Sequence, residues 1–194
     1  EIRSFIGCTN LTSINIPDGV TSIGYSTFWG CSSLTSVVIP DSVTDIEYVA
    51  FLDCSSLTDI VFPDSLTSIG AAAFTNCSSL TSIKIPKNLT MISDNAFDNC
   101  SNLSEFIVDP KNPSFSSEDG VLFDKGKETL LHCPAKKSGT YTIPNGIKSI
   151  GEYAFDSCEN LTSIIISNSV TIINYGAFYG CSNLTSVMIP KSVT

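Results

Sequence analysis

Cysteine is the residue type with the most evident capacity for chemistry in this 194-residue sequence, which contains eight cysteines. Five of them lie 23 residues apart, from Cys8 to Cys100, and Cys158 and Cys181 keep the same spacing. Thiols placed at one position of successive coils point the same way, about 5 Å or more apart, which is poor geometry for a disulfide. A straight row also cannot converge on a tetrahedral zinc ion. We interpret the seven as buried thiols that pack as small apolar side chains, and we expect no metal.

The dipeptide His132-Cys133 is the remaining candidate for reactive chemistry. Neighbouring residues in a strand point to opposite faces, so this pair is poorly placed to act as base and nucleophile. His132 is also the only histidine in the chain. The segment SSEDG at 116–120 lacks the spaced oxygen ligands of a calcium loop, and we expect a turn there. We therefore predict no enzymatic activity, no catalytic residue and no cofactor.

The elements that carry these residues repeat with the same 23-residue period. Phenylalanine and proline keep step with cysteine, giving the pattern C-x-x-L-T-S-I-x-I-P-x-x-V-T-x-I-x-x-x-A-F-x-x. The stretch L-x-x-I-x-I alternates apolar and polar residues, which is typical of a half-buried strand, and the following proline ends the pairing. Ala50 and Phe51 mark a tight helical or 3₁₀ turn. The strands expected on this basis are 11–16, 34–39, 57–62, 80–85, 103–108, 140–143, 161–166 and 184–189.

A single coil of this kind cannot bury its own apolar residues, whereas stacked coils can. The whole chain, 1–194, is therefore predicted to form one domain of about eight 23-residue repeats, cut from a longer protein. An irregular repeat of 35 residues at 109–143 interrupts the 23-residue period. Within it, DGVLFD and KETLLHCP predict a β-hairpin that bulges from the solenoid. Its turn is expected at Asp124–Lys127, with Gly126 supplying a positive φ.

The repeated text CSSLTSVVIPDSVTDI, with AF four residues later, resembles the BspA-like leucine-rich repeats over essentially the whole chain. The irregular unit NPSFSSEDGVLFDKGKETLLHCPAKKSGTYTIP resembles a variant repeat of that family. The resemblance implies a right-handed solenoid with a parallel concave β-sheet and with short strands and turns on the convex side. Proteins of this type are mostly surface-exposed or secreted proteins of host-associated bacteria and mucosal protozoa. Those with known roles are adhesins or antigens that bind host matrix proteins such as fibronectin and fibrinogen, or other microbes.

The bulk composition restricts the partners of the chain. Its net charge of −9 and pI of about 4.4 disfavour contact with phosphate backbones and anionic lipids, so we expect neither nucleic acid nor membrane as a partner of this segment. No apolar run approaches the length of a membrane span. The resemblance implies a cell-surface or secreted protein that binds a host matrix or microbial protein.

Two surfaces are candidates for that binding. Strand alternation turns one side chain of every repeat outward on the concave sheet, and five of these eight are apolar. A row of exposed apolar side chains indicates an interaction surface, although β-branched residues also simply suit strands. The candidate residues are Val38, Val61, Lys84, Ile107, Ile165 and Met188. The second candidate is the irregular repeat, where five of the ten basic residues gather: Lys111, Lys125, Lys127, Lys136 and Lys137.

The sequence thus favours a surface adhesin or antigen module. The alternative function is a structural spacer that displays another domain. The spacer hypothesis predicts no ligand and tolerance of changes in the concave row.

Overall fold

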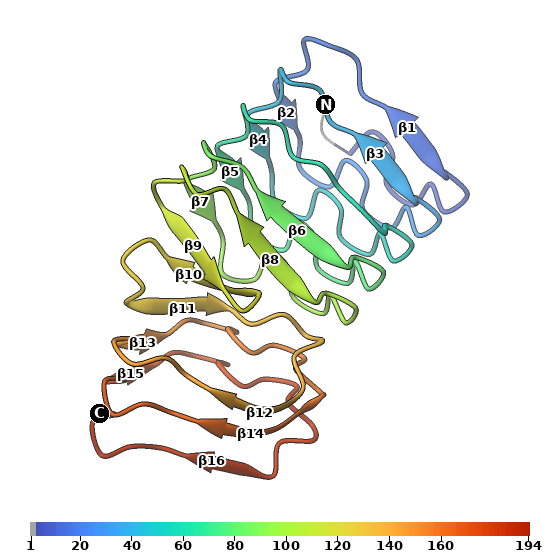
Figure 1. The fold of residues 1–194 in the computed structure, drawn as a ribbon. Helices are drawn as coiled ribbons and strands as arrows, with labels where there is room; N and C mark the ends of the chain where they lie inside the picture. The colour runs from blue at the N-terminus through green and yellow to red at the C-terminus, as the bar shows by residue number, and fades with distance from the viewer. Residues whose placement is uncertain (1–2) are drawn as a thin grey trace.

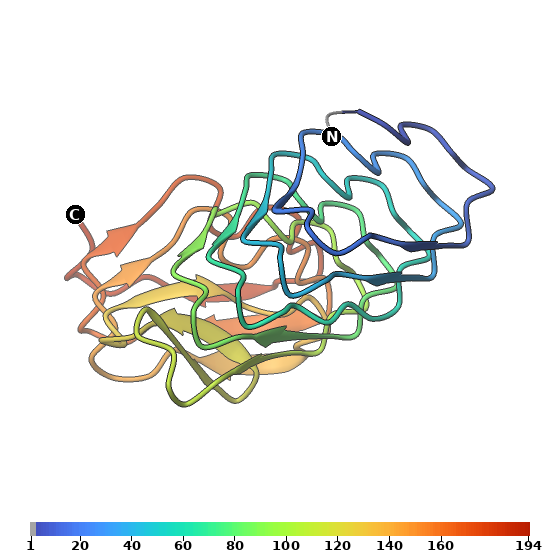
Figure 2. The same ribbon diagram turned by 90° about the horizontal axis from the view of Figure 1, so that it is seen from above.

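The computed structural model describes residues 3–194, which form a solenoid of stacked coils (Figure 1). Each regular coil has a front strand, a short back strand and a turn segment that leads to the next coil (Figure 2). Residues 3–194 contain no helix, so the turn around Ala50 and Phe51 is a non-helical turn. The predicted leucine-rich-repeat solenoid with parallel strands is confirmed.

The front strands come from the L-x-x-I-x-I stretches, and they pair in parallel with a constant offset. Ser13 pairs with Ser36 and Ser163 with Ser186, each 23 residues apart. The register follows from the pattern, because a slip by one residue would turn every apolar side chain to solvent. The front strands are β1 (Ser13–Asn15), β3 (Ser36–Val38), β6 (Ser82–Ile85), β8 (Glu105–Val108), β12 (Gly139–Thr142), β14 (Leu161–Ile165) and β16 (Ser186–Met188).

The back strands follow the prolines. The carbonyl of Pro40 accepts a hydrogen bond from the amide of Val43 at 3.0 Å, so the chain turns directly after the front strand. Two residues then pair with the neighbouring coil before the next turn. The back strands are β2 (Ser22–Ile23), β4 (Asp45–Ile46), β5 (Ser68–Ile69), β7 (Met91–Ile92), β13 (Ser149–Ile150) and β15 (Ile172–Ile173).

The turn segments place the phenylalanines in a column. The rings of Phe28, Phe51 and Phe74 stack at centroid distances of 5.1 and 5.2 Å, with interplanar angles of 20° and 6°. Each such pair contributes about 0.5–1.5 kcal/mol beyond its burial. The turns require residues in the left-handed region, such as Val49 at φ 49° and Asp53 at φ 62°. The ring column and the apolar front and back side chains together fill the interior of the coils.

One front strand is missing from the expected set. Residues 57–62 form no regular strand, and only Val61 makes an isolated parallel bridge, to Val38. The adjacent backbone hydrogen bond, from the amide of Thr58 to the carbonyl of Thr35, is long at 3.3 Å. The chain nevertheless follows the same path there, since Leu57 and Ile60 are buried like their repeat equivalents.

The irregular repeat is built into the stack. Its strands are β9 (Phe115–Glu118), β10 (Val121–Asp124) and β11 (Thr129–His132), which pair antiparallel in the order β9–β10–β11. β11 then pairs in parallel with β13, so the irregular repeat forms one sheet with the back strands of the second part, β13 and β15. The predicted hairpin is confirmed. Its expected projection from the solenoid is wrong, because both faces of its strands pack against coils.

Strand β10 forms the seam between two hydrophobic clusters. Leu122 packs into the cluster of the first part of the chain, whereas Val121 and Phe123 pack into that of the second. All three side chains are completely buried. The front sheet is interrupted at this seam, since β6–β8 and β12–β14–β16 are separate sheets. The front strands of the two parts accordingly run in different directions (Figure 1).

Two turn assignments in the irregular repeat also differ from expectation. Segment 116–120 is strand up to Glu118, and only Asp119 and Gly120 turn, with φ of 50° and 76°. In the β10–β11 turn it is Lys127, at φ 51°, that adopts the left-handed conformation, and not Gly126.

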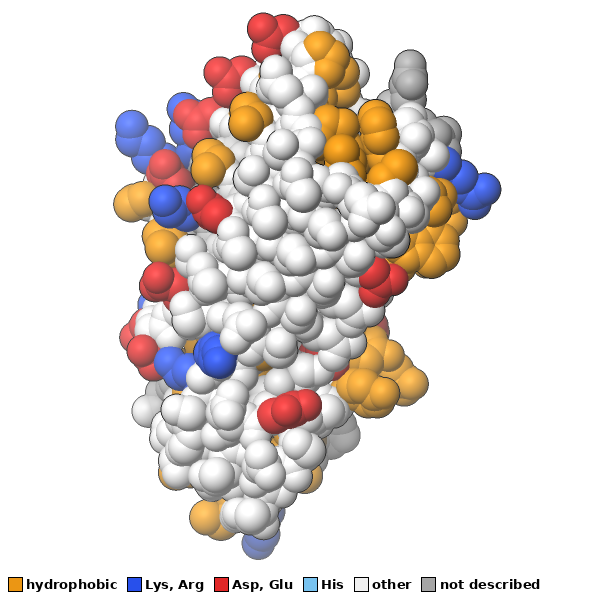
Figure 3. Space-filling model, turned by 90° about the vertical axis from the view of Figure 1, so that its right-hand side faces the viewer, with side chains coloured by type: hydrophobic (Ala, Val, Ile, Leu, Met, Phe, Trp, Pro, Cys, Tyr) orange, Lys and Arg blue, Asp and Glu red, His pale blue; other side chains and the backbone are white. Residues whose placement is uncertain are grey.

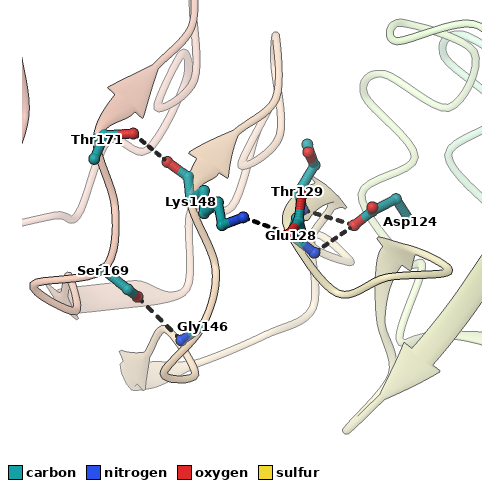
Figure 4. A network of polar contacts seen from close by, with 7 residues as sticks. All are labelled: Asp124, Glu128, Thr129, Gly146, Lys148, Ser169 and Thr171. Carbon is teal, nitrogen blue, oxygen red and sulfur yellow. Dashed lines mark hydrogen bonds and ion pairs between the residues drawn. The ribbon is translucent and has the colours of Figure 1, made fainter.

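Asp124 stabilises the β10–β11 turn, in which Lys127 is left-handed. Its Oδ1 accepts hydrogen bonds from the amides of Glu128 and Thr129, at 2.8 and 2.6 Å. Glu128 in turn forms an ion pair with Lys148 of the next coil (Figure 4). The turn is therefore fastened both internally and to the second part of the stack.

Candidate protein-binding surface

The outward row of the front strands lies on the surface as the alternation predicts. We call it the front stripe: Asn15, Val38, Val61, Lys84, Ile107, Thr142, Ile165 and Met188. Its apolar members are strongly exposed, with Val38 at 64%, Val61 at 62% and Met188 at 73%. Their strand neighbours Val37 and Ile60 are buried, because successive side chains of a strand point to opposite faces.

Strand register brings the members of the front stripe side by side within each part of the stack. Val38 pairs with Asn15 and bridges to Val61, and Lys84 pairs with Ile107. In the second part, Ile165 lies between Thr142 and Met188. The strands that carry the stripe belong to three separate sheets, β1–β3, β6–β8 and β12–β14–β16, and the seam lies between the second and the third.

The side chains of the front stripe are suited to contact with another protein surface. Its side chains are aliphatic apart from Asn15, Lys84 and Thr142, and the row beside it carries the carboxylates Asp59 and Glu105. Such a surface gains free energy by burying apolar area against a partner, while the flanking polar residues supply directional hydrogen bonds. Figure 3 shows another side of the molecule, where the backbone and side chains that are neither hydrophobic nor charged predominate and hydrophobic side chains gather near the edges.

The five lysines of the irregular repeat do not form one open positive patch. Lys127 forms an ion pair with Glu118 at 2.6 Å, and Lys137 pairs with Asp119. The ammonium of Lys137 also lies 5.6 Å from the ring centre of Tyr141. Lys111, Lys125 and Lys136 are exposed. Two of the five charges are thus compensated within the repeat itself.

His132 and Cys133 are both buried, at 5% and 4% exposure. The His132 ring packs against Phe97 and Phe106, with centroid distances of 6.2 and 5.8 Å. Burial lowers the pKa of His132 to about 4. Cys133 belongs instead to the cluster of the second part. Its amide donates a hydrogen bond to the carbonyl of Ala154 in the next coil, as the amide of Phe51 donates to the carbonyl of Ala73. Cys133 therefore replaces a phenylalanine of the column.

The cysteine row has a role that the sequence did not reveal. Five of the seven thiols donate a hydrogen bond to the carbonyl of a phenylalanine 26 residues earlier, as in Cys54 to Phe28 at 3.1 Å and Cys77 to Phe51 at 3.2 Å. Cys158 donates instead to the carbonyl of Cys133, at 3.6 Å. Burial raises the pKa of the Cys54 and Cys77 thiols well above the ordinary value, which favours the protonated, hydrogen-bonding form. The buried thiols therefore link successive coils. The one exposed member is Cys8.

The structure also contains a group that sequence reasoning missed. Tyr153, Tyr175 and Tyr179 line a hollow together with Asp98 and Asp156, on the turn side of the seam. The available signal was the presence of three tyrosines in the turn segments of two consecutive repeats, 151–156 and 174–179. The proximity of the two aspartates could not be read from the sequence, because the irregular repeat lies between them.

The described part of the chain offers neither a cluster of metal ligands nor a membrane-spanning helix. No three histidine, cysteine or acidic side chains within it lie close enough together to hold a metal ion. Residues 3–194 also contain no helix capable of crossing a bilayer.

Comparison with known proteins places the chain among bacterial repeat proteins. A leucine-rich repeat protein from Eubacterium ventriosum is 33% identical, with a TM-score of 0.83, over 95% of this chain and 55% of its own. A leucine-rich cell surface protein from Faecalibacterium prausnitzii is 32% identical, with a TM-score of 0.74, over 97% of this chain and 57% of its own. The pneumococcal vaccine antigen PcpA, 23% identical, shares the fold with a TM-score of 0.74, over 94% of this chain and 51% of its own.

The chain thus spans about half the length of these solved structures. No curated protein matches it. The family model for the BspA-type leucine-rich repeat region matches six copies, over residues 1–118 and 132–194. With nearly all of its length matched by that model, the chain belongs to the BspA-type leucine-rich repeat family.

Proposed function

We propose that this chain is a protein-binding module of a cell-surface or secreted protein, acting as an adhesin or antigen that contacts host matrix or microbial proteins. The observation that carries the proposal is the exposed apolar character of the front stripe. Scattered exposed apolar residues are normal, but here the strand register aligns them in neighbouring coils. The similar Faecalibacterium prausnitzii protein is described as a cell surface protein, which supports the proposed location.

The arrangement suits recognition of an extended protein surface. Val38 and Val61 form one apolar section, and Ile165 and Met188 form the second, beyond the seam. Lys84 and Glu105 provide charges of opposite sign near the middle of the stack. A partner that follows the stripe would meet apolar contacts at both ends and polar contacts between them, as in many protein interfaces.

The experiment is a surface-binding assay of the fragment against immobilised fibronectin, fibrinogen and mucin. The test variant combines Val61→Asp with Ile107→Asp, which places two carboxylates in the front stripe. We expect saturable binding by the native fragment and at least about a tenfold weaker affinity for the variant, because burying two unpaired carboxylates in an interface costs more than about 1.4 kcal/mol, which corresponds to a tenfold change.

The chain offers a matched control on the back sheet. Met91 and Ile172 are exposed by 56% and 50%, comparable to the stripe residues. The double variant Met91→Asp with Ile172→Asp adds the same charges at a different face, and it should bind like the native fragment. Circular dichroism verifies that both variants are folded. Equal loss in both variants would refute the front stripe as the site, and no binding by any protein would favour the spacer function.

A further inference from the structure

The turn side of the seam contains a hollow of about 580 Å³ whose lining differs from the rest of the surface. Its walls combine three tyrosines with two aspartates, and its lining includes no lysine, arginine or histidine. We call it the tyrosine–carboxylate pocket. Its residues come from both parts of the stack: Asp98, Tyr153, Asp156, Tyr175 and Tyr179.

The pocket exists because the irregular repeat contributes no turn segment of the regular kind. In regular coils, the amide at this repeat position bonds a carbonyl of the next coil, as Asn76 bonds Asp98 at 3.0 Å. The equivalent amide of Asn99 bonds the Asp156 carboxylate instead, at 2.8 Å. Ser157 also donates to the side chain of Asn99, at 2.6 Å. Turn segments that are 57 residues apart in the chain are thereby brought together, and two carboxyl groups face one hollow.

The aromatic wall is held in place by a glycine. The ring of Tyr153 meets those of Tyr175 and Tyr179 nearly edge-on, at centroid distances of 5.6 and 6.2 Å. A Cβ atom at Gly176 would lie 2.7 Å from the Tyr153 ring, so glycine leaves the space that this ring occupies. Tyr175 and Tyr179 remain 74% and 65% exposed, which leaves their rings open to a ligand.

The carboxyl groups of the pocket are short of compensating charge. Asp156 is 7% exposed, and Oδ1 of Asp98 is buried without a hydrogen-bond partner among the described residues. Burial, with the nearby carboxylates Asp156 and Asp94, raises the pKa of Asp98 to about 7. Burial also raises the pKa of Asp156. A buried carboxylate without a partner is costly, and a bound cation with N–H donors would remove that cost.

The same repeat position already holds a cation elsewhere in this chain. Tyr25 stands where Tyr175 stands in its own repeat, and the guanidinium of Arg3 lies 5.0 Å from the ring centre of Tyr25. An aromatic face attracts a cation through the negative potential of its π system. The pocket offers this face together with two carboxylates, and none of the described residues that line it carries a positive charge.

We propose that the tyrosine–carboxylate pocket binds a primary ammonium or guanidinium group, either of a free alkylamine or of a lysine or arginine side chain presented by a protein. The unpartnered Asp98 oxygen requires a hydrogen-bond donor, so a cation with N–H groups is preferred to a quaternary one. The pocket lies on the turn side and is separate from the front stripe, so its function does not depend on the protein-binding proposal above.

The test measures binding of small probes to the native fragment by two-dimensional NMR at pH 8 and low salt. The probes are n-butylammonium and n-butylguanidinium, with tetramethylammonium and neutral n-butanol for comparison. We expect the first two to shift the resonances of Tyr153, Tyr175 and Tyr179 with millimolar affinity. Tetramethylammonium should bind more weakly, and butanol should cause no saturable shift. A lysine peptide and its acetylated form then show whether a protein-borne ammonium is accepted.

Two variants and one matched control locate the site. Asp98→Asn and Tyr175→Ala should each weaken n-butylammonium binding at least about tenfold. Tyr48→Ala removes an exposed tyrosine at the same repeat position in the first part of the stack and should leave binding unchanged. Lowering the pH to 5.5 should also weaken binding about tenfold or more as Asp98 takes up a proton beside Asp94, Asp156 and the Tyr153 phenol.

Four outcomes would overturn the proposal. They are the absence of saturable binding up to about 50 mM probe, equal binding by Asp98→Asn, loss of binding in Tyr48→Ala, and saturable binding of a neutral saccharide such as methyl glucoside where the amines fail. The last result would assign the aromatic wall to carbohydrate recognition.

Discussion

At the scale of single residues, His132 is the most unusual side chain in the core. It is the only histidine of the chain, and it lies between Phe97 and Phe106 at the seam. Its Nε2 has no hydrogen-bond partner among the described residues. Burial therefore keeps the ring neutral and lowers its pKa to about 4. His132 is therefore a polar side chain that is buried among aromatic rings.

This placement predicts a specific dependence of stability on pH. In the unfolded chain His132 titrates near 6.5, so between that pH and about 4 the unfolded state binds more protons than the folded state. The contribution of His132 to stability is consequently lost as the pH falls from about 6.5 toward 4. The variant His132→Leu has no group that titrates at this position and therefore does not show this loss. We expect the unfolding free energy of the variant minus that of the native fragment to be about 1–3 kcal/mol larger at pH 4.5 than at pH 7.5.

Urea unfolding of both proteins at the two pH values measures this difference. Because any packing change caused by leucine is present at both pH values, it cancels in the comparison. A free-energy difference between variant and native fragment that is the same at pH 4.5 and 7.5 would show that His132 titrates normally.

At the scale of elements, the turn segment supplies contacts that hold each coil to its neighbour. It supplies a stacked phenylalanine, and it supplies a thiol that bonds a carbonyl of the coil before, as Cys100 bonds Phe74. Both contacts recur with the repeat, and both need a neighbouring coil. Cys8, near the start of the row, has the same sequence context but is exposed. Cys8 therefore serves as an exposed reference for the contribution that a buried thiol makes to the free energy of unfolding.

The comparison of Cys77→Ala with Cys8→Ala isolates the role of the buried thiol. The first variant removes a fully buried side chain and its hydrogen bond to Phe51. We expect a loss of about 1–3 kcal/mol in the free energy of unfolding. The second variant should change it by less than about 0.5 kcal/mol. Denaturant unfolding measures both, and equal effects would contradict a structural role for the row.

Thiol labelling of the native fragment provides an independent check on the same row. An alkylating reagent at neutral pH should modify Cys8 rapidly and Cys181 slowly, since Cys181 is half-buried and its pKa is raised to about 12 by burial. The other cysteines should react only after unfolding. Mass spectrometry of digested peptides identifies the modified sites, and rapid labelling of Cys77 in the folded state would contradict the described packing.

At the scale of the whole molecule, the seam divides the interior of the stack into two hydrophobic clusters. The two hydrophobic clusters share strand β10, whose side chains alternate between them. Neither sheet is continuous from one part to the other, since the back strands form the separate sheets β2–β4–β5–β7 and β9–β10–β11–β13–β15, and the front strands β6–β8 and β12–β14–β16 are also separate. Repeat proteins derive their stability from contacts between neighbouring coils, so these breaks in strand pairing weaken the coupling between the parts.

This division predicts that damage to one part is not transmitted fully to the other. Phe155→Ala removes a buried ring from the second cluster and should cost about 3–5 kcal/mol. Hydrogen exchange should then show the loss of amide protection concentrated in residues 139–194. Phe51→Ala is the matched change in the first cluster and should reverse the pattern. A uniform loss of protection along the chain in both variants would contradict two parts and indicate a single cooperative unit.

The sequence by itself determined the repeating coil. Strand alternation and the turn after proline act within a few residues, so the period of 23 is enough to specify which side chains enter the core. The register of the front strands, the phenylalanine column and the exposure of the front stripe all follow from that local pattern. Even the hairpin at 121–132 was predictable, because its two apolar runs and its turn are adjacent in the chain.

The tertiary structure alone decided what happens where the period breaks. Val121, Leu122 and Phe123 are consecutive apolar residues, a pattern typical of a strand buried on both faces. The sequence does not state which coils cover those faces, and so the hairpin was expected to project. The carbonyl partners of the thiols and the meeting of Asp98 with Asp156 also depend on segments far apart in the chain. Such contacts are set by how coils stack, and a local pattern carries no information about them.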